Sequence, residues 1–398
     1  MNIISEFYLK KLILLNTFSL AFVFFEPSLF EYTFLIIFLL LIFDKYNFYK
    51  FYEMVKKNKN FIIFILLYNL NFLLNLRNSD FRFLLITNFM FLVYIIYTYF
   101  SNYLNCKKAI LEYFNISALC NAFLALLIYV LLMFSYINNN SLLTFGGRIK
   151  LFFKDPNVFA SYMLISFFLC IEKSLKYKLK KYFYFTIIIF ITIFITFSRA
   201  TFLSLIFGLI MVFFNSHYKN KKDIIKYYLI FFIIIIFISI ATNWGNNYIL
   251  KCNVGRLIPF LKPNENNTLL QTYDSYGRFY SWRAGLILLK NNYLLGYGPG
   301  SYEKLSVDIQ KKINTKIITP SAHNTFLRIL VENGLILFLV FLFLIYIHIK
   351  NSYYRGEINY IIIISLLINM LFIDGLHFRH FWILLALTEK NYSKDIKF

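Results

Sequence analysis

The chain has 398 residues, of which 60% are hydrophobic and 15% charged, and its mean hydropathy is +0.63. Soluble domains are only about half apolar, so this composition excludes a soluble fold and predicts an integral membrane protein. The formal net charge of +22 does not indicate nucleic-acid binding, because the basic residues stand in short clusters between apolar runs, as topology signals do.

Apolar segments recur along the whole chain and predict an all-α, polytopic fold with about twelve transmembrane helices. Lysine-rich clusters occupy alternate short loops, which places both termini in the cytoplasm by the positive-inside rule. The final segment is short for a full crossing. The predicted spans are residues 12–25, 28–43, 60–76, 83–100, 112–136, 156–171, 182–197, 200–215, 227–242, 324–349, 358–373 and 378–388.

The chain is predicted to be a single transmembrane domain, residues 1–398, with one large outer loop, residues 243–322, between the ninth and tenth spans. Residues 277–291 of this loop place Phe279, Trp282, Leu286 and Leu289 at helical spacing. We therefore expect an amphipathic helix there, lying flat on the outer interface. A glycine-rich turn follows it.

Arginine is distributed unevenly across the predicted membrane. A guanidinium stays charged and binds phosphate through a bidentate fork, whereas lysine acts as a point charge. The set therefore predicts a phosphate-bearing substrate on the outer side, although any single member can equally be an anchor at the lipid headgroups. Nine of the ten arginines fall on the outer side or at outer helix ends: Arg77, Arg82, Arg148, Arg199, Arg256, Arg278, Arg283, Arg328 and Arg379.

His323 stands at the predicted first turn of the tenth span, at the end of the large loop. The positive end of the helix dipole opposes protonation there, so a neutral imidazole is available to accept a proton. A histidine that takes a proton from a sugar hydroxyl is a suitable general base. The alternative is an interfacial histidine that only caps the helix.

Other charged residues fit simpler roles beside the functional ones. Arg199 follows a hairpin so tight that it lies near the membrane surface, where a charge needs an anionic partner or a wet cavity. Arg328 and Glu332 are four residues apart on the tenth span and pair with each other in the simplest interpretation. Asp155-Pro156 reads as a helix start, with aspartate as N-cap.

The sequence contains no P-loop, no dinucleotide-binding fingerprint and no outer cluster of metal ligands. We therefore expect neither a cofactor nor a metal. Chemistry at the outer surface would use a preactivated donor that already resides in the membrane.

Four segments resemble the O-antigen ligase/polymerase family of bacterial membrane glycosyltransferases. Two features depart from the pattern: Tyr293 replaces a proline, and Leu337 stands where the ligase signature has a small residue, Thr or Tyr. The segments are KDPNVFA at 154–160 (D-x-N-x-x-A), TFSRA at 196–200 (S-R-[GA]), Gly277-Arg278-x-x-x-Trp282 with the Leu294 to Gly300 run, and His323-Asn324 with Gly334 after nine residues.

This resemblance implies a GT-C-type enzyme of the bacterial inner membrane with its active site on the periplasmic face. It would transfer a glycan from undecaprenyl diphosphate to a lipid A–core hydroxyl, with inversion and without metal. His323 would be the general base, and Arg199 and Arg278 would hold the diphosphate and stabilise its charge. Substrate-binding residues would include Arg148 and Arg283, as second choices for the diphosphate, with Asn324 and Trp282.

Other acceptors and another class of protein stay open at this point. A polymerase would join lipid-linked repeat units, and a protein O-oligosaccharyltransferase would modify hydroxyl side chains. The single dominant outer loop and the His-Asn-x9-Gly spacing favour the ligase. A transporter of lipid-linked glycans would also suit about twelve spans, but transporters usually show related halves and charges near the midplane.

Overall fold

The computed structural model describes residues 3–23, 25–134, 142–144, 148–215, 218, 221–244, 268–313, 315 and 317–389. These residues form α-helices, and the β pairing among them is one isolated bridge between Leu143 and Ile149. The all-α fold predicted from hydropathy is therefore confirmed. Arg256, in the stretch 245–267 of the large loop, lies outside the described residues, as does the tail after Glu389.

The helices belong to two compact units, between which the chain passes several times. Unit 1 comprises residues 1–44, 104–265 and 353–369, and unit 2 comprises residues 45–103, 266–352 and 370–398. Unit 1 contains α1 (Ile3–Ser19), α2 (Leu29–Phe43), α6 (Lys107–Met133), α7 (Pro156–Tyr177), α8 (Lys180–Ile195), α9 (Arg199–Phe214), α10 (Lys221–Trp244) and α15 (Asn359–Met370). Unit 2 contains α3 (Lys45–Lys57), α4 (Lys59–Leu74), α5 (Phe81–Asn102), α12 (Thr268–Asn291), α13 (Ser301–Lys312), α14 (Thr325–Tyr354) and α16 (Arg379–Thr388).

Helix α7 is the core of unit 1 and packs on α6, α8 and α9. Its start follows the expected pattern, since the Asp155 carboxylate accepts the backbone N–H of Asn157 at 2.6 Å and proline is the first helical residue. Gly208 of α9 lets the two helices meet closely, because a Cβ there would lie 2.2 Å from Phe168. Unit 1 thus holds the α8–α9 hairpin against a rigid central helix.

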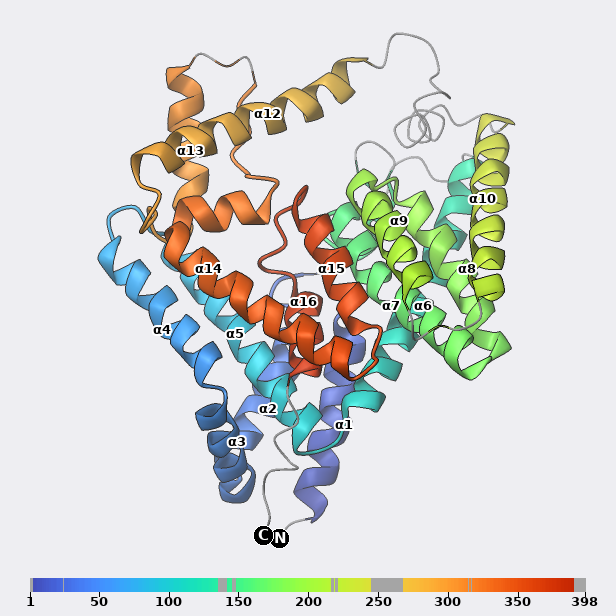
Figure 1. The fold of residues 1–398 in the computed structure, drawn as a ribbon, viewed down its shortest axis with the longest axis horizontal. Helices are drawn as coiled ribbons and strands as arrows, with labels where there is room; N and C mark the ends of the chain where they lie inside the picture. Colours follow the sequence, from blue (N-terminus) through green and yellow to red (C-terminus); the bar gives the residue numbers. More distant parts are fainter. Residues whose placement is uncertain are drawn as a thin grey trace. The chain divides into compact units, whose positions relative to one another are not determined.

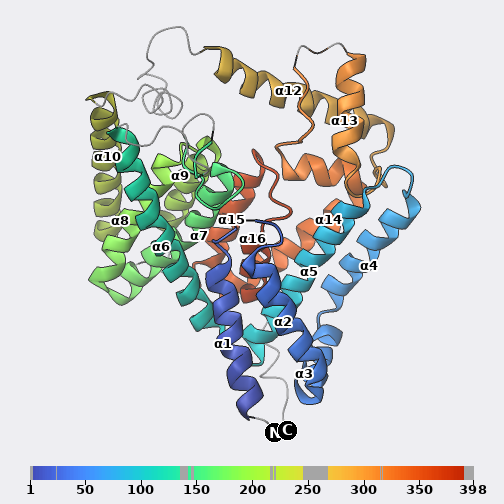
Figure 2. The ribbon, with the colours of Figure 1, turned by 180° about the vertical axis from the view of Figure 1, so that it is seen from behind.

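Unit 2 is built around α5 and the short α16, which packs against it. Trp382 of α16 is 1% exposed and meets Phe61 and Phe91 edge-on. Both views show α12 and α13 at one end of α4 and α5, and α3 at the other end (Figures 1 and 2). Unit 2 therefore has two distinct ends, joined by α4, α5 and α14.

The helix lengths indicate a membrane protein. Among the described residues, α5, α6, α7 and α14 are long and apolar enough to cross a bilayer, and α2, α4, α9 and α15 are shorter apolar helices. Each predicted span coincides largely with a helix, but the number of crossings stays a prediction. The ten residues of α16 rise only about 15 Å, roughly half of a hydrocarbon core.

Candidate functional site

His323 lies in the loop before α14, one residue ahead of the residue that caps the helix. The Asn324 side-chain oxygen accepts the backbone N–H of Leu327 at 3.0 Å, as an N-cap does. His323 was expected in the first helical turn, but it lies two residues before the first helical residue, Thr325, because Asn324 is the cap. The His323 φ of 46° is left-handed, which costs a non-glycine residue roughly 1–2 kcal/mol. The surroundings must hold this loop.

Two consecutive residues of α12 supply that support. The indole N–H of Trp282 donates to the Ala322 carbonyl at 2.8 Å, and the Ser281 hydroxyl donates to the Ser321 carbonyl at 2.8 Å. These bonds fix the two residues that precede His323. Trp282 therefore holds the backbone beside the histidine, and Ser281, which sequence reasoning missed, does the same from the adjacent position in the motif.

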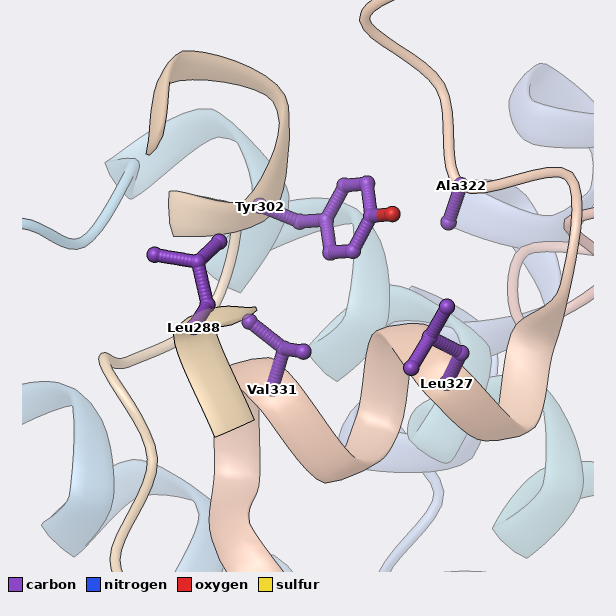
Figure 3. Close-up of a cluster of buried hydrophobic side chains, with 5 residues drawn as sticks. All are labelled: Leu288, Tyr302, Ala322, Leu327 and Val331. Carbon is purple, nitrogen blue, oxygen red and sulfur yellow. The ribbon is translucent and has the colours of Figure 1, made fainter. Parts of the chain in front are cut away.

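An apolar cluster locks α12, α13 and α14 together beneath this loop (Figure 3). The Tyr302 ring is fully buried between the helices, and its hydroxyl donates to the Ser281 carbonyl at 2.8 Å. Burial raises the pKa of Tyr302 to about 12, so the hydroxyl stays a donor. The members of the cluster are Leu288, Tyr302, Ala322, Leu327 and Val331.

Helix α12 confirms the predicted helix over 277–291 and begins earlier, at Thr268. Phe279 and Leu286 are 58% and 56% exposed, whereas Trp282 and Leu289 pack against the buried cluster. The apolar residues of the predicted interfacial face are thus divided between the surface and the core. The exposed pair keeps one apolar stripe available to a membrane interface.

Arg278 and Arg283 lie on α12 on either side of Trp282. Arg278 is half-buried and Arg283 is exposed. Gly277 is buried, and a Cβ there would lie 2.4 Å from the Thr319 hydroxyl. Glycine is needed at this point for α12 to approach the segment that leads to His323. The helix that supports the histidine loop therefore also carries two of the predicted arginines.

Gly334 breaks α14 after its first nine residues. Its φ of 72° and ψ of 177° are not helical, and a Cβ there would lie 2.1 Å from the Leu294 carbonyl oxygen. At this break the backbone of α14 pairs with that of the 293–298 run. The N–H of Tyr297 donates to the Val331 carbonyl at 3.0 Å, and the N–H of Gly298 donates to the Glu332 carbonyl at 2.7 Å. In the other direction, the N–H of Leu335 donates to the Tyr293 carbonyl at 2.8 Å. The glycine-rich run and the His-Asn-x9-Gly segment thus form one structural unit.

Arg328 lies at the centre of a buried ion cluster. It is 3% exposed, its Nε lies 3.0 Å from Glu332 Oε1, and it also pairs with Asp374 and, at 3.8 Å, with Glu303. The predicted Arg328–Glu332 pair is confirmed. Its other partners come from α13 and from the loop before α16, and no local sequence pattern points to them. The cluster fixes the first part of α14 in place.

Thr325, the first residue of α14, is hydrogen-bonded to the loop that precedes α16. Its hydroxyl donates to the Ile373 carbonyl and accepts the Gly375 N–H, both at 2.8 Å. In the same loop, His377 Nε2 lies 3.0 Å from the Thr87 hydroxyl. Burial lowers the pKa of His377 to about 4, with the Arg328 charge adding to the effect. This histidine is therefore neutral near pH 7.

Unit 1 brings three other predicted elements together. Arg148 donates from Nε to the Thr196 carbonyl and from Nη2 to Asn157 Oδ1, both at 3.0 Å. Ser198 donates to the same Asn157 oxygen at 2.8 Å. Arg199, the exposed first residue of α9, follows directly. The D-x-N segment, Arg148 and the Ser-Arg turn therefore form one hydrogen-bonded group, while the His323 group belongs to unit 2.

Within the described residues, no group of three or more His, Cys, Asp and Glu side chains could hold a metal ion. Around His323, the Ser281 hydroxyl and the Trp282 indole N–H donate to backbone carbonyls, and the Asn324 side-chain oxygen accepts a backbone N–H.

A comparison with protein-family models matches residues 184–342 to the O-antigen ligase family. The matched range runs from α8 into α14 and includes Arg199, Arg278, His323 and Gly334, while the Asp155 to Asn157 segment precedes it. No curated protein sequence matches the chain. The resemblance to the O-antigen ligase family that the motifs indicated is confirmed.

Proposed function

From the O-antigen ligase match over residues 184–342, we propose that the chain is an O-antigen ligase of the bacterial inner membrane. It transfers a glycan from undecaprenyl diphosphate to a lipid A–core hydroxyl on the periplasmic face, without a metal. The observation that carries the proposal is the frame of hydrogen bonds from α12 that fixes the residues before His323. A fixed backbone beside the general base supports the proposal, because transfer without a metal relies on well-positioned side chains.

In this mechanism His323 removes the proton from the acceptor hydroxyl. The hydroxyl oxygen attacks the anomeric carbon of the donor sugar from the face opposite the diphosphate. The bond between the anomeric carbon and the diphosphate oxygen breaks, and undecaprenyl diphosphate leaves with the bonding electrons. Configuration at the anomeric carbon is inverted. General-base assistance of this kind contributes about 10²–10⁴-fold.

Arg278 is the diphosphate-binding residue of unit 2 in the proposal, and Arg199 is the candidate for this role in unit 1. Their guanidiniums match the diphosphate oxygens and stabilise the negative charge that grows on the leaving group. Arg278 lies one helical turn before Trp282, so the helix that positions the histidine loop also positions this arginine. Arg283 is the exposed second choice on the same helix.

Arg148 acts on the diphosphate indirectly in the proposal. Its guanidinium already donates to the Thr196 carbonyl and to Asn157, which also accepts from Ser198. The arginine therefore holds the turn that presents Arg199. Asn324 has an analogous role in unit 2, where its side chain caps α14 beside His323.

The proposal is tested by His323→Ala in a strain that relies on this gene. Transfer of glycan to lipid A–core should fall by at least about 10²-fold, the lower range for loss of a general base. The amount of inserted protein and its thermal unfolding should stay normal, because the His323 side chain is only half-buried and is not part of the apolar cluster. Transfer near the wild-type rate would refute the assignment of the base.

A polymerase that joins lipid-linked repeat units is the second candidate, and Leu337 is the observation that favours it. This residue occupies the last position of the ligase signature, where a small residue, Thr or Tyr is expected. Its side chain is 5% exposed and lines a small apolar cavity with Tyr68 and Phe341. The catalytic roles of His323 and the arginines are the same in both reactions, and only the acceptor differs.

A further inference from the structure

Unit 2 contains a cavity of about 340 Å³ at the end of α14 that is remote from His323. Its wall includes His348, which lies fourteen residues after the break at Gly334, or about 20 Å along the helix. Both views place α3, whose last residue lines this cavity, at the end of unit 2 opposite α12 and α13 (Figures 1 and 2). The cavity therefore has no part in the proposed transfer reaction.

The charges in the wall favour an anion. Lys57 and Lys59 line the cavity at the junction of α3 and α4, and within the described part of the chain neither forms an ion pair. Glu389 lies in the same wall, where its carboxylate accepts the Tyr94 hydroxyl and lies 3.6 Å from His348 Nε2. The wall therefore has two positively charged lysines and one carboxylate, and this carboxylate already binds the Tyr94 hydroxyl.

Apolar side chains lie in the wall and along the helices that carry it. Leu344 and Ile347 of α14 line the cavity, together with Asn58, Asn60 and Asn351. Helices α4 and α14 touch through Phe64 and Phe341, whose rings are 6.1 Å apart. Both helices expose long apolar side chains along their length, including Leu66 and Leu73 on α4 and Phe343 and Tyr346 on α14, each between 53% and 64% exposed.

Helix α3 carries the signature of a membrane interface next to this cavity. Lys50 and Lys56 lie over the rings of Tyr46 and Tyr52, at 4.1 Å and 5.3 Å from the ring centroids. Tyr49 is 64% exposed. Lysines interleaved with exposed aromatic rings on an amphipathic helix are typical of segments that lie among anionic headgroups.

We propose that this cavity binds the phosphate group of an anionic membrane phospholipid, with Lys57 and Lys59 on the phosphate and the acyl chains along α4 and α14. The two lysines select the headgroup, and the exposed apolar side chains of α4 and α14 favour a lipid over a free anion. The site lies at the end of the unit away from the histidine loop and does not depend on the proposed transferase activity.

The test uses the purified full-length chain in a neutral detergent, titrated with phosphatidylglycerol or phosphatidylcholine while bound lipid is counted by native mass spectrometry. The double variant Lys57→Gln/Lys59→Gln should bind phosphatidylglycerol about 30-fold more weakly, because the loss of each lysine weakens binding about fivefold. The matched variant Lys45→Gln/Lys50→Gln removes the same charge from α3 at positions seven or more residues before Lys57, at least about 10 Å away along the helix. It should change binding by less than about threefold, because charges about a Debye length away are screened.

Three results would overturn the proposal. Equal losses in the two double variants would mean general attraction to a basic surface. Equal binding of phosphatidylglycerol and phosphatidylcholine would mean that the lysines do not read the headgroup. Protection against thermal unfolding by inorganic phosphate alone, at the level given by phosphatidylglycerol, would identify a site for a free anion. Thermal unfolding of each variant in detergent alone verifies that it is folded.

Discussion

Replacing Trp282 by Phe removes one hydrogen bond from the loop that precedes His323. Phenylalanine keeps an aromatic ring against the buried cluster, so the packing of α12 on α13 is largely retained. The lost group is the indole N–H, which donates to the Ala322 carbonyl at 2.8 Å. The change therefore tests whether the hydrogen bond to the loop, rather than the bulk of the ring, matters for transfer.

The expected magnitude follows from burial of the acceptor. Ala322 is 0% exposed, so its carbonyl loses a partner that water cannot replace, at a cost of about 1–3 kcal/mol. Thermal unfolding should shift down by roughly 2–4 °C for each kcal/mol. Misplacement of a catalytic group by about 1 Å can reduce a rate about 10²-fold. We expect kcat to fall 10- to 100-fold with the donor KM nearly unchanged.

Trp382→Phe is a matched control in the same unit. Its indole N–H donates to the Leu376 carbonyl at 2.7 Å, and its ring is 1% exposed. Both variants should lose a similar amount of thermal stability, measured in detergent. Glycan transfer in membrane vesicles should fall selectively in Trp282→Phe. Equal transfer rates in the two variants at equal protein levels would refute the role assigned to the loop.

Three further predictions concern the surrounding structure. Gly334→Ala should destabilise the chain by more than about 3 kcal/mol, through left-handed strain and loss of the backbone hydrogen bonds to the 293–298 run. The control Gly356→Ala, also at positive φ (64°), should cost only about 1 kcal/mol. Thermal unfolding of the two variants compares these costs. Arg328→Met should cost about 3–5 kcal/mol, because it strands buried carboxylates, and adding Glu332→Gln should recover part of the loss of melting temperature. His377 is neutral in the folded chain, and its pKa is lowered from 6.5 to about 4. Its contribution to the free energy of unfolding is therefore fully present above pH 6.5 and is lost as the pH falls toward 4. His377→Gln should lessen that decline in melts across this range, and an unchanged pH profile would contradict it.

Local sequence patterns predicted the elements that depend on local physics. Hydropathy placed the apolar helices, Asp155-Pro156 marked the start of α7, and the spacing of Arg328 and Glu332 predicted their pair. The tight hairpin at 197–200 also follows from its sequence, since Ser198 caps α9 through the N–H of Thr201. Each of these features is decided by residues within one or two helical turns.

Long-range contacts account for what the sequence did not reveal. Residues 324–349 were predicted as one continuous span, and the break at Gly334 becomes visible only when the 293–298 run pairs with it. Asp374 joins Arg328 from 46 residues away, and the lysine-rich stretch between the second and third predicted spans forms the helix α3. The left-handed backbone of His323 likewise depends on α12, which closes the loop from 40 residues upstream.

The central claim is best tested by comparing two glycan pools in a strain that lacks this gene: lipopolysaccharide and undecaprenyl-linked glycans. A ligase predicts bare lipid A–core together with long polymer retained on the lipid carrier, restored by the wild-type gene and not by His323→Ala. Core capped by a single repeat, with no long polymer in either pool, would identify the polymerase. If neither pool changes, the chain does not transfer lipid-linked glycans to these acceptors and the account is wrong.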